Sequence, residues 1–197
     1  MKTFQELQEG VYDPNIFKAI FMAGGPGSGK SYVARRTTGG LGMKMVNSDD
    51  IYEKMLNDAG LDTTPEDIYS DQGQEIRGRA KGVTKRMQGN FLEGRLGLII
   101  DGTGKDYDKI AKQVQGLKAL GYECYMIFVN TSLDTAQEQN AKRKRTLPEK
   151  EVADMWNAVQ NNIGKFQRLF GGKNFIIVDN NMAGEDVFEK VWKRCML

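Results

Sequence analysis

The stretch FMAGGPGSGKS, residues 21–31, decides the fold of this chain. Residues 24–31 match the pattern G-x-x-x-x-G-K-[ST], after an apolar run and before a helix-like segment at 32–36. A strand before and a helix after is the context in which this pattern forms a phosphate-binding loop. The glycines let successive N–H groups point into one concave nest, and the following helix adds its positive end. The stretch therefore predicts a site for the phosphates of a nucleoside triphosphate.

The residue types in this loop predict individual roles. Lys30 is expected to reach the outer phosphates, and the Ser31 hydroxyl is placed to ligate Mg²⁺. The expected nucleotide-binding residues are Gly25, Pro26, Gly27, Ser28, Gly29, Lys30, Ser31 and Tyr32. The alternative is a glycine-rich turn that matches by chance. A dinucleotide-binding loop of the G-x-G-x-x-G type does not fit, because a lysine stands where its last glycine should be.

Composition limits the other classes of function. The chain has 197 residues, 40% of them hydrophobic and 27% charged, with a net charge of +2, which suits a single globular domain spanning 1–197. There is no histidine and there are only two cysteines, outside any C-x-x-C pair, so we expect neither zinc nor a histidine-based triad. No apolar run has the length of a signal peptide core or a membrane span. We expect a cytoplasmic protein without a membrane partner.

Apolar runs alternate with helix-like segments along the chain. Strands are expected at 17–23, 43–47, 96–100, 122–129 and 175–178. Helices are expected at 62–91, 106–120, 133–145, 148–170 and 185–195, with a short N-terminal arm at 1–16. The helix at 62–91 is expected to break at its glycines, and Thr146 and Glu149 form a candidate capping box for the helix at 148–170. This order predicts an α/β protein with a mostly parallel sheet, which binds ligands beyond the carboxyl ends of its strands.

Acidic residues follow two of the expected strands. Asp49 and Asp50 come after the second strand, and we expect Asp49 to take the proton from an incoming hydroxyl. The alternative is that either carboxylate caps the helix that starts near Ile51. Asp101 closes the third strand in the Walker-B manner and is a candidate Mg²⁺ ligand, with Thr103 a candidate contact to the acceptor. The alternative there is a simple strand-end turn.

Two groups of basic residues are candidates for binding phosphate. The run 142–145 lies in an expected lid at about 133–148, and we expect Arg143 to contact the donor phosphates as the lid closes. The alternative is an ordinary solvated helix end. Arg77, Lys81 and Lys85 share one helical face by their spacing. Whether that face binds a phosphorylated acceptor or is merely solvated stays open at this point.

The segments GPGSGKS, NSDD, IIDGTG and QNAKRKR together resemble the kinase domain of phage-type polynucleotide kinase. They also resemble the related zeta-toxin-like and small-molecule P-loop kinases, over about residues 17–179. The resemblance implies a three-layer P-loop NTPase fold with a five-stranded parallel sheet in the order 2-3-1-4-5, helices on both faces and a basic helical lid. It also implies that Asp49 is the general base, that Arg143 contacts the donor phosphates, and that Asp101 and Thr103 face the acceptor.

One departure concerns the acceptor. The polynucleotide kinases carry an arginine shortly after the aspartates, which grips the acceptor's phosphate, and here Tyr52 stands at that position. The resemblance still implies a kinase that uses ATP and Mg²⁺ to phosphorylate a hydroxyl, with a nucleic-acid 5′-end preferred over a nucleotide or small metabolite. A GTP-binding switch is the alternative suggested by 101–104, which fit D-x-x-G, but no N-K-x-D motif follows the fourth strand. A third reading is a nucleotide-binding module without turnover.

Overall fold

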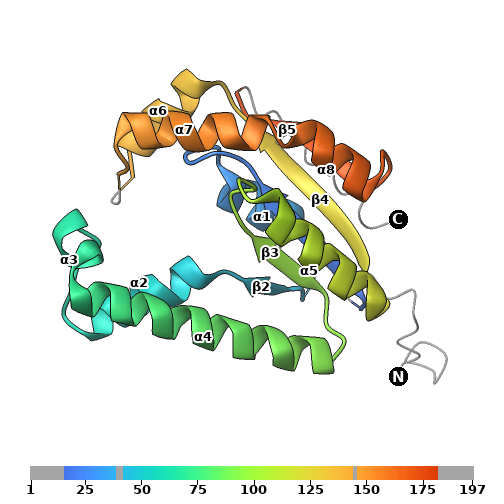
Figure 1. Ribbon diagram of the computed structural model, residues 1–197, viewed down its shortest axis with the longest axis horizontal. Coiled ribbons are helices and arrows are strands. Elements are labelled where there is room, and N and C mark those ends of the chain that lie inside the picture. Colours follow the sequence, from blue (N-terminus) through green and yellow to red (C-terminus); the bar gives the residue numbers. More distant parts are fainter. Residues whose placement is uncertain (1–15, 39–41, 144–145, 182–197) are drawn as a thin grey trace, which may run out of the picture.

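Five parallel strands form one sheet in the order β2-β3-β1-β4-β5 (Figure 1). The computed structural model describes residues 16–38, 42–143 and 146–181. The strands are β1 Lys18–Ala23, β2 Lys44–Val46, β3 Leu98–Asp101, β4 Glu123–Asn130 and β5 Phe175–Asp179. The helices are α1 Lys30–Thr38, α2 Ser48–Asp58, α3 Pro65–Tyr69, α4 Asp71–Glu93, α5 Tyr107–Ala119, α6 Leu133–Ala141, α7 Glu149–Gln160 and α8 Ile163–Phe170. The strand order and the three-layer architecture expected from the resemblance are confirmed.

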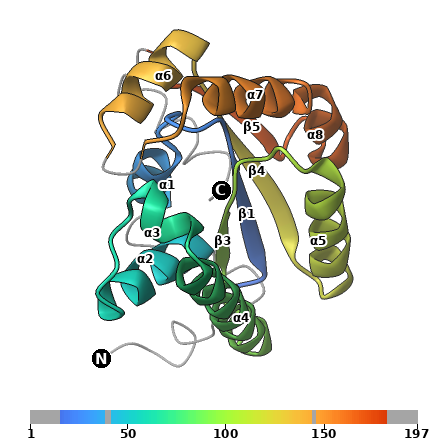
Figure 2. The same cartoon turned by 60° about the vertical axis from the view of Figure 1, so that its left-hand side comes forward.

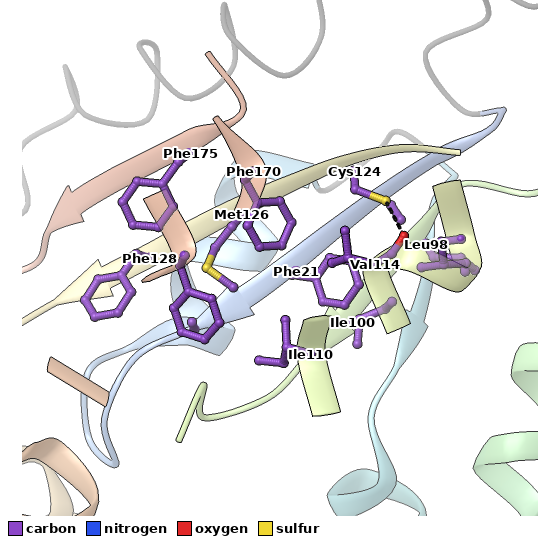
Figure 3. Close-up of a cluster of buried hydrophobic side chains, with 14 of the residues drawn as sticks. Phe21, Leu98, Ile100, Ile110, Val114, Cys124, Met126, Phe128, Phe170 and Phe175 are labelled. Carbon is purple, nitrogen blue, oxygen red and sulfur yellow. Dashed lines mark hydrogen bonds between the residues drawn. The ribbon is translucent and has the colours of Figure 1, made fainter. Parts of the chain in front are cut away.

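The central strand β1 is buried on both faces. Phe21 points into the cluster formed with α5, α7 and α8, whereas Ile20 and Met22 point into a second cluster that includes Val33 of α1. Figure 3 shows the first cluster, in which aromatic side chains from three strands and α8 meet. Cys124 lies there too, and burial raises the pKa of its thiol to about 11, so it packs as an apolar group. Burial on both faces explains why β1 is a continuous apolar run.

The helices α2, α3 and α4 form a group of their own (Figure 2), and α4 packs beside strand β2 (Figure 1). A third, small cluster holds them together, composed of Tyr52, Leu56, Ile68, Ile76 and Ala80. Helices α6 and α7 lie on the opposite side of the strand tips (Figure 1). The carboxyl ends of the strands thus lie between two helical groups, which is where the sequence predicts the ligands.

Three expected helices differ from the observed ones. The helix expected at 148–170 is two helices with a tight turn at 161–162, where the side-chain amide of Asn162 donates to the carbonyl oxygens of Gly104 and Lys105 at 3.0 Å each. The helix expected at 62–91 breaks at Ser70 rather than at a glycine, since Ser70 is extended and its hydroxyl caps α4 at Gly73. Helix α6 ends at Ala141, so Arg143 lies in the loop that follows it. The capping box at 146 and 149 does not form, because α7 has no side-chain cap.

Two expected segments lie outside the described residues: the N-terminal arm, except Ile16, and the helix at 185–195. Ile16 forms an isolated antiparallel bridge with Leu96. Among the helices of the described ranges, none combines the length and the apolar character needed to cross a bilayer.

Candidate active site

The loop between β1 and α1 has the backbone that a phosphate nest requires. Gly24, Gly27 and Gly29 have φ values of +153°, +74° and +83°, which side-chain-bearing residues rarely adopt. Gly27 also leaves no room for a side chain, since a Cβ there would collide with the carbonyl oxygen of Ala136 in α6. The loop is therefore held in its curled form by glycine conformations and by close packing on α6.

Replacing Gly27 by alanine is expected to destabilise the protein by more than 1 kcal/mol and to weaken ATP binding, because the positive φ and the contact with Ala136 both oppose a Cβ. Thermal unfolding and ATP titration measure the two effects. Gly78→Ala is the matched control: a Cβ at Gly78 in α4 meets nothing within 4 Å, so this change should stabilise the helix by roughly 0.5–1 kcal/mol. Equal effects of the two substitutions would contradict the close packing of the loop.

The phosphate loop is fixed from three sides by residues whose role the sequence did not reveal. The amide of Asn180, just after β5, donates to the carbonyl oxygen of Ser28 at 2.9 Å. The indole of Trp156 in α7 lies against Gly25 and donates to the carbonyl oxygen of Thr131 at 2.9 Å. The N–H of Gly24 donates to the carbonyl oxygen of Thr103 at 3.0 Å, which joins the loop to the end of β3. These contacts preorganise the loop before any nucleotide arrives.

Lys30 lies folded over this loop. Its ammonium donates to the carbonyl oxygens of Gly24 and Gly25 at 2.8 and 2.9 Å, and more weakly to the Ser28 hydroxyl at 3.5 Å. Burial, with a smaller contribution from Arg143, lowers the pKa of Lys30 to about 8, although Asp101 and Asp49 oppose the shift. The pKa of Lys30 is therefore influenced by Asp49, Asp101 and Arg143, the three other charged residues that the sequence predicts for this site. Ser31 and Tyr32, the next residues, are exposed at the start of α1.

The side chain of Asn47 joins the ends of β2 and β3. Its amide group donates to Asp50 Oδ1 at 3.2 Å and to Asp101 Oδ2 at 3.3 Å, while its oxygen accepts from the N–H of Asp49 at 2.8 Å. Asn47 is thus the N-cap of α2. The helix-capping alternative for Asp49 and Asp50 is not what the structure shows, and the Asp49 carboxylate is exposed at the first turn.

Asp101 carries a buried oxygen with nothing to bind among the described residues. Its Oδ1 atom has no hydrogen-bond partner there, although Oδ2 accepts from Asn47. Burial raises the pKa of Asp101, and Asp50 and Asp49 add to the rise, while Lys30 and the backbone N–H of Gly102 oppose it. A buried carboxylate oxygen without a partner is costly unless it meets a cation, so the residue fits a Mg²⁺ ligand. No cluster of three or more acidic, cysteine or histidine side chains that could hold a metal occurs within the described ranges.

Two hydrogen bonds between Asn140 and Leu147 close the loop after α6. The buried amide of Asn140 donates to the carbonyl oxygen of Leu147 at 2.9 Å and accepts from the N–H of Leu147 at 3.1 Å. Arg143 lies within this loop and is exposed, and 144–145 lie outside the described residues. Because α6 also packs on Gly27, the start of the loop that carries Arg143 is held next to the phosphate loop.

Comparisons with known proteins agree with this geometry. A family model described as an AAA domain, AAA_33, matches residues 20–161. No curated protein matches the chain. Among solved structures, a protein of the PezAT chromosomal toxin–antitoxin system of Streptococcus pneumoniae is 18% identical, with a TM-score of 0.66 over 91% of this chain and 83% of that one.

Two further structures show the breadth of this fold. A chain of the Pnkp1/Rnl/Hen1 RNA repair complex is 20% identical, with a TM-score of 0.60 over 77% of this chain and 46% of that one. A gluconokinase from Sinorhizobium meliloti 1021 is 13% identical, with a TM-score of 0.52 over 92% of this chain and 90% of that one. At these identities the likenesses establish the fold. Since the family match covers most of the chain and includes the phosphate loop, the chain belongs to the AAA_33 family of P-loop kinases, which are ATP-dependent phosphotransferases.

Proposed function

We propose that the chain transfers the γ-phosphate of ATP to the 5′-hydroxyl of a nucleic acid, with residues 1–197 acting as one kinase domain. The observation that carries the proposal is that Asn47 links the N–H of Asp49 to the carboxylate of Asp101, and that the charges of Asp49, Asp101 and Arg143 all act on the Lys30 ammonium at the phosphate loop. An exposed carboxylate opposite a phosphate-binding lysine is the pairing that phosphoryl transfer to a hydroxyl needs.

In the proposed reaction, the backbone of 25–29 and the start of α1 hold the ATP phosphates. Lys30 and Arg143 neutralise the charge that spreads over the migrating phosphoryl group. Asp49 accepts the proton of the attacking hydroxyl, and Thr103 contacts the acceptor. Catalysis then consists mainly of positioning and electrostatic stabilisation, since the phosphoryl group passes directly from the donor to the acceptor oxygen.

Magnesium is the expected metal of this site. Ser31 and Asp101 would hold it, with Asp101 offering the oxygen that lacks a partner among the described residues. Bound Mg²⁺ would neutralise negative charge on the donor phosphates. Two protein ligands are consistent with the metal's habit of keeping several of its waters.

A small-molecule or nucleotide acceptor, as in the zeta-toxin-like kinases, is the second candidate. The observation that favours it is Tyr52, whose side chain is buried where the polynucleotide kinases have an arginine. Its hydroxyl has no hydrogen-bond partner among the described residues. A GTP-binding switch remains the weakest alternative, since no guanine-reading N-K-x-D follows β4.

The test is incubation with γ-labelled ATP and Mg²⁺ and a panel of acceptors. The panel holds single-stranded RNA and DNA with 5′-hydroxyl ends, the same strands with 5′-phosphates, nucleosides, nucleotide sugars and sugar acids. We expect label on the 5′-hydroxyl strands only. Label on a small acceptor and none on the strands would contradict the proposed acceptor, and a strong preference for GTP over ATP in competition would contradict the kinase assignment.

A further inference from the structure

Helix α4 concentrates positive charge on a chain that is nearly neutral overall. Between Glu75 and Glu93 it contains no acidic residue and five basic ones, Arg77, Arg79, Lys81, Lys85 and Arg86, whereas the whole chain has a net charge of +2. None of the five forms an ion pair with a carboxylate anywhere in the described ranges. A solvated helix usually intersperses both signs, so this segment has the charge of a surface that binds a polyanion.

The five cations lie on two flanks of the helix. Arg77, Lys81 and Lys85 follow one another at intervals of four residues and form one ridge. Arg79 and Arg86 lie on the other flank, where they line a groove of about 430 Å³ together with Met55, Gly82 and Val83. The buried strip of α4, which includes Ile76 and Ala80, lies between the two flanks and packs on α2.

Contacts with α2 show which flank adjoins the candidate active site. The guanidinium of Arg77 lies over the ring of Tyr52, 5.4 Å from its centroid. Tyr52 is three residues beyond Asp49 and shares its side of α2, whereas Met55 of the groove is six residues beyond Asp49 and does not. The ridge of Arg77, Lys81 and Lys85 therefore starts on the side of α2 that carries Asp49, and the groove lies on the other side.

We propose that Arg77, Lys81 and Lys85 form a phosphate track for a single-stranded nucleic acid whose 5′-hydroxyl is presented to Asp49. This inference rests on the proposed function and specifies its acceptor as a strand several nucleotides long. The cations repeat about every 6 Å along the helix, from 1.5 Å per residue. Lysines act on phosphates as point charges without reading bases, so the track accepts any sequence. Arg77, held on Tyr52, supplies a cation on the side of α2 that carries Asp49, at the position where Tyr52 replaces the arginine of the polynucleotide kinases.

The experiment compares two double variants of the full-length protein that each remove two charges from α4. Lys81→Gln with Lys85→Gln alters the track, and Arg79→Gln with Arg86→Gln alters the groove as the matched control. Binding of a 3′-fluorescein-labelled 12-nucleotide strand with a free 5′-hydroxyl is measured by anisotropy without ATP, at several salt concentrations. Initial rates with the same strand and γ-labelled ATP follow, and thermal unfolding and the KM for ATP establish that each variant is folded.

We expect the track variant to bind the strand about 10-fold more weakly and to raise its KM by a similar factor with kcat unchanged. The slope of log K against log salt should fall by about 1.4 for the two lost contacts to a single strand. The groove variant should match the wild type. Wild-type behaviour of the track variant overturns the inference, and so does an equal loss in both variants, because either result shows that no particular ridge guides the strand.

The binding measurement and the phosphate-transfer measurement together distinguish a failure of this inference from a failure of the proposed function. Transfer of phosphate to the strand at wild-type KM in the track variant leaves the proposed function standing and overturns the track. Binding that depends on Lys81 and Lys85, with no transfer of phosphate to the strand, supports the track as a binding surface and overturns the proposed acceptor. Absence of strand binding by the wild type overturns both.

Discussion

Replacing Lys30 by methionine is expected to lower kcat for phosphoryl transfer by about 10³-fold, the loss typical of a main electrostatic donor to the transition state. The same change should raise the Tm of the ATP-free protein. Burial lowers the pKa of Lys30 to about 8 from its ordinary 10.5, which means that the folded protein holds this charge at a cost of roughly 3 kcal/mol at neutral pH. Methionine has similar length and carries no charge, so it removes that cost while losing the bonds to Gly24 and Gly25.

The sign of the pH dependence follows from the same shift. The folded pKa lies below the unfolded one, so the destabilising cost is fully present below pH 8 and fades as the pH rises from 8 to 10.5. The Tm advantage of the methionine variant should therefore shrink over that interval. ATP affinity of the wild type should fall above pH 8, because free Lys30 loses its charge there, and binding should take up protons in calorimetry.

Lys112→Met in α5 is the control for this prediction, since Lys112 is exposed and lies in the middle of a helix outside the candidate site. It should leave kcat unchanged and move Tm little. A methionine variant at position 30 that is less stable than the wild type at pH 7 would show that the hydrogen bonds to the loop outweigh the cost of burying the charge. A variant with wild-type kcat would remove Lys30 from the proposed mechanism.

Replacing Asp49 by asparagine is expected to lower kcat by about 10²–10⁴-fold, the range of a general base, while leaving the Kd for ATP unchanged. Asparagine keeps the shape of the side chain but cannot accept the proton of the attacking hydroxyl. The fold should tolerate the change because the carboxylate of Asp49 is exposed and α2 is capped by Asn47 through the backbone N–H of residue 49. Single-turnover transfer and ATP titration measure the two quantities.

The neighbouring Asp50→Asn is the matched control, because Asp50 bonds to the amide of Asn47 and has no proposed role in proton transfer. We expect it to retain most of the activity. If Asp50→Asn abolishes transfer and Asp49→Asn does not, the base has been assigned to the wrong member of the pair. Loss of ATP binding in Asp49→Asn would show a role in the nucleotide site instead.

The three central strands were predictable because β1, β3 and β4 are buried along almost their whole length and are therefore continuous apolar runs, whereas β2 and β5 at the edges of the sheet have exposed positions. All five expected strands lie within two residues of the observed bounds at each end, from β1 at Lys18–Ala23 to β5 at Phe175–Asp179. The meeting of Asp49 and Asp101 near Lys30 was also predictable, because the carboxyl ends of parallel strands share one edge.

The supporting residues were not predictable from local patterns. The side chains of Trp156 and Asn180 donate hydrogen bonds to carbonyl groups that are distant in sequence, and Asn140 donates to a carbonyl group across a loop. Hydrophobic periodicity does not reveal which carbonyl group a side-chain N–H will bind. Asn47 and Asn180 each directly follow a strand, and this position at the carboxyl end of a strand was the one sequence feature that could have marked them as site residues. The break between α7 and α8 was missed because it lies at Asn162, whose side-chain amide bonds to two carbonyl groups of the distant β3–α5 loop that no local pattern indicates.

The contact between Trp156 and Gly25 gives the protein a built-in optical reporter. The indole lies directly behind the phosphate loop and donates to Thr131, so its emission depends on the polarity and rigidity of that loop. The chain has one other tryptophan, Trp192, outside the described residues. In a Trp192→Phe background, nucleotide arrival could be followed in real time by stopped-flow fluorescence, with no dye attached to either partner.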